Sequence, residues 1–430
     1  FCMKAFMSPR AWWRGGLAGL VPALLCVAPG CAPQPNKSTT PPPTPSDDPA
    51  DFVVDTQVTY RHVLGEPRFV VPGAGLPRDT PVTSSNNNVD IIFFEDRLFM
   101  AWRTSETHWA SSNTLMYIVS SVDGGTTWLR EATIDLGADV REPRFLVINS
   151  TLFFYWFEAG GNPLAFEPRF FWRMERQASG QWSNKVQGGE NAEVPWCMKV
   201  RNGVGYMTSY RGMHYQLDGA SAIEVFFKKS TDGRTWLPVN PDRPVVYRGG
   251  VSEATFEFAE NGDLWAVTRN EDGDDTGFGS HVCHAPAADI SQWDCGSRSN
   301  PERYDSPWMV RHGRDFYLVA RRDVGGPFDE GRTDLSFEDQ RTAYLVNYWN
   351  RPKRSALYRL NTSTRAVEHL VDLPGVGDTS FPSVRRTGPH SFLLANYTSP
   401  LDQPDISWIE AQGSPRGTQI YLMTLDFTPQ

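Results

Sequence analysis

Acidic, amide and arginine side chains recur at equivalent places in six related stretches of this sequence. Acidic and amide residues lie at the openings of the stretches, where the second stretch also has Arg144. An arginine or a tyrosine closes each stretch except the second, which ends in Glu158. A carboxylic acid paired with a carboxylate can perform general acid–base catalysis and glycoside hydrolysis, and arginine binds carboxylates through two parallel hydrogen bonds. The recurring residues are Asn87, Asn88, Asp90, Arg103, Glu142, Arg144, Glu158, Glu193, Arg211, Glu253, Arg269, Asp305, Arg321, Asp378 and Tyr397.

The six stretches share one pattern, a short strand, a polar turn and a strand of large apolar residues. They begin at Asn86 ("NNNVDIIFFEDRLFMAWR"), Arg141 ("REPRFLVINSTLFFYWFE"), Ala192 ("AEVPWCMKVRNGVGYMTSYR"), Ser252 ("SEATFEFAENGDLWAVTR"), Tyr304 ("YDSPWMVRHGRDFYLVARR") and Asp378 ("DTSFPSVRRTGPHSFLLANY"). Further short strands follow in each unit, and no useful helical periodicity follows the N-terminal region. Four short strands per unit are typical of a β-propeller. We therefore predict an all-β, six-bladed β-propeller over residues 53–430, its last blade completed by N-terminal residues such as "VTYRHVL".

In such a propeller the first strand of each blade lines the central channel. Its starting residues, and those at the end of the second strand, would converge on one mouth of that channel. Two interpretations stay open, because buried charges must be paired. The charges are ion pairs that lock the blades together, or they form an anion- and sugar-binding mouth with a general acid.

Two polar turns carry a family resemblance. "SSVDGGTTW" (120–128) and the shorter "STDGRTW" (230–236) are predicted to follow the third strands of units one and four. They resemble the Asp-box, or BNR repeat, of sialidases, in which the box is a structural turn away from the active site. We therefore expect no catalytic role for Asp123 or Asp232.

The resemblance to sialidases also implies an active site. The fourth unit resembles the sialidase segment with a catalytic Glu and a substrate-binding Arg, which implies that Glu253 activates the nucleophile and Arg269 binds substrate. "ANYTSPL" resembles the segment with the nucleophilic tyrosine, here Tyr397, and Arg321 would be another substrate-binding arginine. The implied function is an exo-acting, sialidase-like glycoside hydrolase on terminal sugars of glycans, without cofactor or metal.

The chain departs from the sialidase pattern at its first blade. "NNNVD" stands where sialidases have Arg-Ile-Pro, so Arg68 or Arg103 would have to replace the first arginine, and Asp90 or Glu106 the acid/base.

"REPRF" (141–145) instead resembles elements of propeller furanosidases and mannoside phosphorylases, which use carboxylate pairs. Glu142, Glu193 and Glu253 could supply such pairs, and Arg144 and Asp305 complete the predicted substrate-binding set. The rival function is a non-catalytic surface module that binds glycan or protein.

Residues 324–354 form an insertion in unit five that we expect to be a lid or binding loop. Its Tyr344, Tyr348, Trp349 and Arg351 would suit a wall that contacts sugar.

The N-terminal region predicts export. Positive charge in "MSPRAWWRGG", an apolar run and "APGC" ending at Cys31 resemble a bacterial lipoprotein signal over residues 1–31. A Pro/Ser/Thr-rich tether over 32–52 follows. We expect a lipoprotein of the outer membrane or cell surface, held to the membrane only by lipid. The alternative is that the signal is cleaved without lipidation and the protein is secreted.

The net charge and the cysteines indicate which partners and bonds to expect. A net charge of -9 without a basic cluster argues against nucleic acid. Cys283 and Cys295 could form a disulfide after export, and Cys197 is expected to be a buried thiol. No Cys/His spacing indicates zinc.

Overall fold

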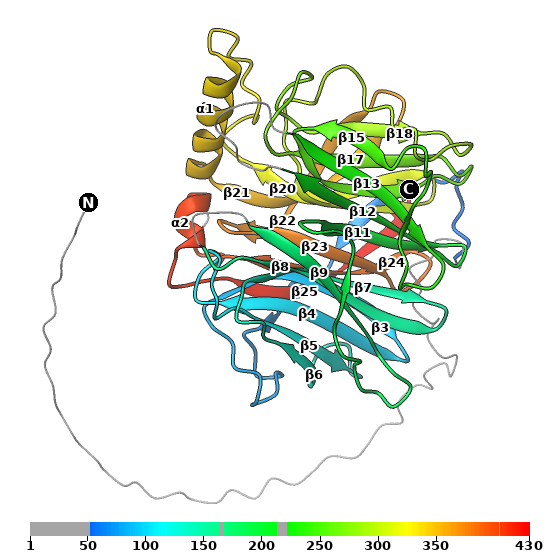
Figure 1. Ribbon diagram of the computed structural model, residues 1–430, viewed down its shortest axis with the longest axis vertical. Coiled ribbons are helices and arrows are strands. Elements are labelled where there is room, and N and C mark those ends of the chain that lie inside the picture. Colours follow the sequence, from blue (N-terminus) through cyan, green and yellow to red (C-terminus); the bar gives the residue numbers. More distant parts are fainter. Residues whose placement is uncertain (1–51, 163–166, 213–221, 404) are drawn as a thin grey trace, which may run out of the picture. The chain divides into compact units, whose positions relative to one another are not determined.

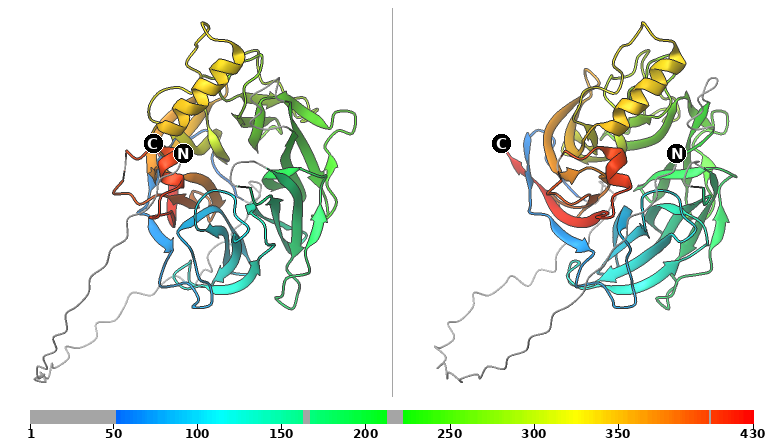
Figure 2. Two further views of the ribbon diagram at one scale, coloured as in Figure 1. Left: turned by 60° about the vertical axis from the view of Figure 1, so that its left-hand side comes forward. Right: turned by 90° about the vertical axis from the view of Figure 1, so that its left-hand side faces the viewer.

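The computed structural model describes residues 52–162, 167–212, 222–403 and 405–430. The predicted signal and all of the predicted tether except Phe52 lie outside these residues. The described chain is all-β, with six small sheets in a ring, which confirms the predicted six-bladed β-propeller (Figures 1 and 2).

The first three blades follow the chain in order. Blade 1 contains β3 (Ser85–Phe94), β4 (Arg97–Ser105), β5 (Leu115–Ser121) and β6 (Leu129–Ile134). Blade 2 contains β7 (Val140–Ile148), β8 (Thr151–Ala159), β9 (Pro168–Glu175) and β10 (Val186–Gly188). Blade 3 contains β11 (Val194–Arg201), β12 (Val204–Gly212), β13 (Ile223–Ser230) and β14 (Leu237–Pro238), and β15 (Val245–Gly249) also pairs with β13.

The other three blades complete the ring. Blade 4 contains β16 (Val251–Phe258), β17 (Leu264–Asn270) and β18 (Val282–Ala285). Blade 5 contains β19 (Asp305–His312), β20 (Asp315–Asp323), β21 (Lys353–Asn361) and β22 (Ala366–Val376). Blade 6 contains β23 (Ser380–Arg386), β24 (Ser391–Thr398) and β25 (Gln419–Pro429), completed by β1 (Tyr60–Leu64) and β2 (Arg68–Val71).

The ring is closed by strands from the two ends of the described chain. β1 pairs antiparallel with β25, from Tyr60 opposite Pro429 to Leu64 opposite Leu425. This confirms that residues of "VTYRHVL" complete the last blade. Successive first strands also contact one another around the ring, β3 with β7 and so on to β23 with β3. The first strands therefore surround one central axis.

All six first strands are irregular near their start. The register against the second strand shifts between Asn87 and Asp90 in blade 1, and between Arg141/Arg144, Pro195/Cys197, Val251/Ala254, Asp305/Trp308 and Ser380/Ser383 in the others. Four blades have a positive φ at the same bulge position, at Asn88 (49°), Glu142 (56°), Ser306 (50°) and Phe381 (63°). Non-glycine residues adopt such angles rarely, and β-bulges re-aim side chains, often next to active sites. The bulges thus separate the mouth of the channel from its interior.

The hydrogen bonds and backbone angles of the turn after β5 explain why it contains Asp, Gly and Thr. The Asp123 carboxylate accepts hydrogen bonds from Ser121 Oγ (2.7 Å), from the Thr126 and Thr127 N–H groups (3.0 and 2.9 Å) and from Thr127 Oγ1 (2.7 Å). Gly124 and Gly125 take φ angles of 68° and 84°, which the turn requires and glycine permits.

The second such turn corrects one prediction. It joins β13 to β14 and therefore belongs to blade 3, not to unit four as predicted. The strand before it, β13, pairs with β12, and this pairing assigns the turn to the blade.

The insertion in blade 5 contains a helix, contrary to the expectation of no helix and of a loop. The α1 helix (Phe337–Asn350) begins after Ser336, whose side chain accepts from the Asp339 N–H. It carries Tyr344 and Tyr348 on its buried face. The shorter α2 (Trp408–Gln412) lies beside it (Figure 1). Neither of these described helices is long and apolar enough to cross a membrane.

The cysteines of the propeller behave as expected. Cys283 and Cys295 form a disulfide in blade 4, and Cys197 is a buried free thiol.

The closing strand yields a stability prediction. Tyr60 is buried, and its ring centroid lies 4.5 Å from that of His312. We expect Tyr60→Ala to lower the free energy of unfolding by about 3 kcal/mol, since it removes a buried aromatic ring. Arg61→Ala on the exposed face of the same strand should change it by less than ~0.5 kcal/mol. Urea unfolding of both variants tests this; equal effects would mean that β1 does not hold the ring closed.

Candidate functional site

Tyr397 meets a carboxylate of its own blade at the mouth. Its hydroxyl donates to Asp378 Oδ1 at 3.1 Å, and His108 Nδ1 lies 2.8 Å from Asp378 Oδ2. His108 comes from the loop after β4, which lies next to blade 6 because β3 of blade 1 contacts β23 of blade 6. His108 is not among the predicted site residues, since an isolated histidine in a loop carries no recognisable pattern.

The protonation states of this trio follow from burial and contact. Burial lowers the pKa of His108 and keeps its imidazole neutral at pH 7, although Asp378 opposes the shift. Burial alone would raise the pKa of Asp378, but its contact with His108, the positive charge of Arg321 and the hydrogen bond from Tyr397 hold it below the usual value. Burial and then Asp378 raise the pKa of Tyr397 well above 10. A protonated phenol therefore faces an ionised base.

Glu253 has other partners. Its Oε1 accepts from Arg269 at 2.5 Å, and its Oε2 accepts from the Ser306 N–H at 2.7 Å. Burial raises the pKa of Glu253 despite Arg269. The carboxylate that contacts the Tyr397 hydroxyl is thus Asp378, whereas Glu253, the predicted base, contacts Arg269 and the Ser306 N–H that the bulge of blade 5 turns toward it.

Asp305 lies at the centre of the arginines of blades 4 and 5. Its carboxylate lies 2.7 Å from Arg303, 3.1 Å from Arg269 and 2.9 Å from Arg321. It also accepts a hydrogen bond from the Tyr348 hydroxyl of α1. Burial alone would raise its pKa, but these cations hold it well below the usual range. Arg269 and Arg321 are therefore already matched by carboxylates.

The arginines of blades 1 and 2 are matched as well. Arg103 Nε donates to Asp139 Oδ1 at 2.8 Å, and Arg141 Nε donates to Asp139 Oδ2 at 2.5 Å. Arg103 is fully buried. Arg141 also donates to the His108 carbonyl at 2.8 Å. This places Arg141 at the mouth and ties blade 2 to the Asp378–Tyr397 pair.

Glu142 is the exception among the carboxyl groups of the mouth. It is 8% exposed, and its Oε2 has no hydrogen-bond partner. Burial raises its pKa to about 8, with Arg144 opposing and Glu253 adding to the shift. At neutral pH Glu142 is therefore a protonated acid with an unused oxygen.

The unmet polar atoms form a pattern around the axis. Asn88 Oδ1 and Ser252 Oγ are also buried without a partner, and they occupy the bulge positions of blades 1 and 4 that Glu142 occupies in blade 2. Buried polar atoms in native proteins nearly always have a partner. Three such atoms at equivalent positions are available to hydrogen-bond with water or with a polar ligand.

Below the bulges, the channel is filled by a plug of Arg144, Trp196, Trp308 and Phe381. The Arg144 guanidinium lies 4.3 Å from the Phe381 ring centroid and 4.8 Å from that of Trp196. Arg144 also donates to the Trp196 carbonyl. It is thus a structural cation of the channel interior rather than a group presented at the mouth.

Asp90 likewise follows its bulge and lies in the interior. It accepts from the Phe145 N–H at 2.6 Å and pairs with Arg385 at 3.1 Å. The structure therefore does not bring Asp90 to Tyr397, because the bulge moves the side chain past the mouth.

The remaining predicted residues lie apart from Tyr397. Glu193 is buried against Lys228 and Ser209. Arg211 pairs with Glu190 and Glu224, and Glu158 accepts from Trp172. Glu106 contacts Ser105, Ser111 and Asn113, and Arg68 donates to the turn at Gly124 and Gly125, which excludes it from the mouth. No group of three His, Cys, Asp or Glu side chains suited to a metal ion occurs among the described residues.

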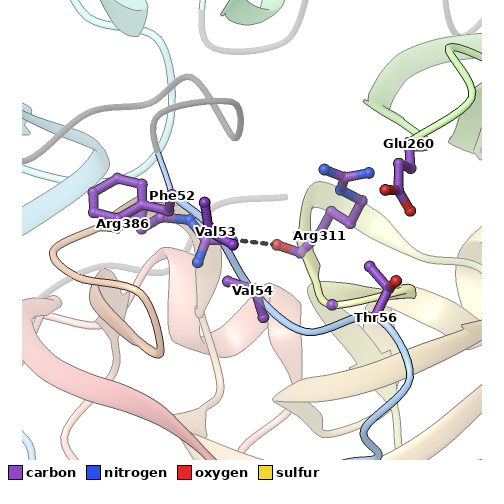
Figure 3. A pocket seen from close by; sticks show the side chains of 8 residues that line it. Phe52, Val53, Val54, Thr56, Glu260, Arg311 and Arg386 are labelled. Carbon is purple, nitrogen blue, oxygen red and sulfur yellow. Dashed lines mark hydrogen bonds between the residues drawn. The ribbon is translucent and has the colours of Figure 1, made fainter.

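A cavity of about 240 Å³ lies at the opposite end of the channel (Figure 3). Phe52, Val53, Val54 and Thr56 line it together with residues from the ends of β16, β19 and β23, namely Glu260, Arg311, Gly313 and Arg386. None of the predicted site residues lines this cavity.

Comparison with known proteins establishes the fold. A protein of unknown function from Dyadobacter fermentans matches with a TM-score of 0.53 and 14% identity, over 86% of this chain and 99% of its own. The sialidase of Trypanosoma rangeli matches with a TM-score of 0.54 and 13% identity over 85% of this chain. This chain covers 59% of that sialidase, which has also been solved in complex with sialic acid. No family model and no curated protein matches the sequence.

The protonation of Glu142 predicts a pH dependence of stability. The folded protein keeps this proton up to about pH 8, whereas the unfolded chain releases it near 4.5. The folded state thus binds more protons between these values, and its stability must fall as the pH rises through them. The melting temperature of Glu142→Gln relative to the unmutated protein should increase from pH 5 to pH 8. A difference that is constant with pH would contradict a protonated Glu142.

Proposed function

We propose that the protein is an exo-acting glycoside hydrolase that removes terminal sugars from glycans at the channel mouth. The observation that carries this proposal is that one channel mouth holds both a protonated buried acid, Glu142, and an ionised base, Asp378, that contacts the Tyr397 phenol. Glycoside hydrolysis needs one proton donor with a raised pKa and one nucleophile. Tyrosine nucleophiles are a known exception to the two-carboxylate scheme.

The reaction would proceed in two steps. Asp378 accepts the phenolic proton of Tyr397 while the phenolic oxygen bonds to the anomeric carbon, and Glu142 gives its proton to the departing glycosidic oxygen. Water then attacks the same carbon and gives a proton to the Glu142 carboxylate. The tyrosine leaves and regains its proton from Asp378. His108 keeps Asp378 oriented toward the phenol.

The plug below the mouth supports an exo mode of action. A glycan chain cannot thread past Arg144, Trp196, Trp308 and Phe381, whose side chains fill the axis. A channel that is closed below its mouth suits the end of a glycan. The unmet atoms of Asn88, Glu142 and Ser252 would receive the hydroxyl groups of that terminal sugar.

A screen of aryl glycosides tests the function. The unmutated propeller should hydrolyse at least one of them, and Tyr397→Phe should fold normally and lose kcat/KM by ~10³-fold or more. Tyr421→Phe is the matched control, since it removes another buried phenol of blade 6 outside the mouth. Full activity in Tyr397→Phe would exclude Tyr397 as the nucleophile. Glycan binding without turnover in the unmutated protein would favour a non-catalytic binding module instead.

We also propose that the protein is exported and lipidated at Cys31. The disulfide between Cys283 and Cys295 supports export, because such bonds persist in oxidising compartments. In bacteria that express the full chain, labelled fatty acid should be incorporated and Cys31→Ala should abolish the label. Labelling that persists in Cys31→Ala would refute the anchor.

A further inference from the structure

A wall of aromatic side chains stands at the mouth beside blades 4, 5 and 6. Its core is Phe278, Phe328, Tyr344, Leu345 and Tyr348, with Phe337 and Trp408 packed against them. The Phe278 ring lies 5.1 Å from that of Tyr344 and 4.8 Å from that of Phe337. Tyr348 connects this wall to the mouth, because its hydroxyl contacts both Asp305 and Arg321.

The wall contains one buried cation without a counter-ion. Arg341 lies on the buried face of α1 with Tyr344 and Tyr348, and it is 1% exposed. Its Nε, Nη1 and Nη2 atoms all lack a hydrogen-bond partner. Five other arginines near the mouth are matched by carboxylates, Arg103 and Arg141 by Asp139, and Arg269, Arg303 and Arg321 by Asp305. Arg144 of the channel interior instead donates to the Trp196 carbonyl and lies over aromatic rings.

Such a side chain destabilises the free protein. Arginine stays charged in proteins, so it cannot escape burial by losing its proton. A buried charge without a partner is unfavourable by several kcal/mol or more. The planar fork of a guanidinium fits a carboxylate or another oxyanion through two parallel hydrogen bonds. An anion bound to Arg341 would thus remove the unfavourable free energy of this buried, unpaired charge.

We propose that Arg341 binds an oxyanion, a carboxylate or a sulfate ester, carried by the saccharide whose terminal sugar occupies the mouth. The saccharide part of this proposal rests on the proposed function. Arg341 and Tyr348 are seven residues apart in one helix, which separates their Cα atoms by about 10 Å along its axis. The anion therefore lies on a unit away from the cleaved bond, and the sugar in the mouth is uncharged because the arginines there are already matched.

Thermal unfolding of the propeller tests the site without turnover. Sulfate and glucuronate should raise the melting temperature of the unmutated protein, relative to glucose in sodium chloride of equal ionic strength. Arg341→Met should melt about 2 °C or more higher than the unmutated protein without ligand, and should lose the stabilisation by anions. Comparing sulfate with glucuronate distinguishes a sulfate ester from a carboxylate as the preferred group.

Two controls make the result specific. Arg332→Met removes an exposed arginine of the same insertion that pairs with Asp334, and it should keep the stabilisation by anions. Arg341→Lys keeps the charge but not the fork, so it should weaken the stabilisation at least threefold without abolishing it.

Three outcomes would overturn the proposal: no stabilisation of the unmutated protein by either anion, equal stabilisation of Arg341→Met, or a lower melting temperature of Arg341→Met without ligand. Absence of glycosidase activity alongside anion binding that depends on Arg341 would overturn the proposed function and leave the anion site standing.

Discussion

The mutual neutralisation of buried charges at the channel mouth is the constraint on which the rest of this structure depends. The single carboxylate of Asp305 is contacted by three arginines, Arg269 from β17, Arg303 from the loop before β19 and Arg321 from β20. Tyr348 adds a hydrogen bond from α1. Burying any one of these charges alone would be strongly unfavourable, so blades 4 and 5 and the inserted helix can only form together around the carboxylate. The few buried polar groups that lack a partner thus stand out against this ion-paired cluster around Asp305.

The bulges explain how a symmetric ring carries an asymmetric site. Each first strand gains residues at the same height, so every blade presents a re-aimed side chain to the axis. Differences in residue type then decide the chemistry: Glu142 stays protonated and Phe381 covers Arg144. The bulge of blade 5 contributes through its backbone, because the Ser306 N–H donates to Glu253. The acid Glu142 and the Phe381 ring of the closed floor thus arise from a single structural feature repeated around the ring, whereas the base Asp378 lies just before β23 and its bulge.

The propeller could be predicted because the same order of strands and turns repeats along the sequence. The role of β1 could be predicted because it has the pattern of a strand but no partner strand near it in the sequence. The partners within the mouth could not. Side chains three residues apart across a bulge, such as Asn87 and Asp90, end in different layers of the channel, and no residue type announces the bulge beforehand. His108 reaches Asp378 only through closure of the ring. The α1 helix was missed because its buried face mixes Arg341 with tyrosines instead of presenting an apolar stripe.

Covalent trapping of the nucleophile tests the central claim most directly. A panel of 2-fluoro glycosyl fluorides would be incubated with the propeller, since fluorine at C2 disfavours the oxocarbenium-like transition state and lets a glycosyl-enzyme accumulate. Peptide mass spectrometry should then find one sugar attached to Tyr397. Attachment to Glu142, Glu253 or a residue outside the mouth would contradict the account.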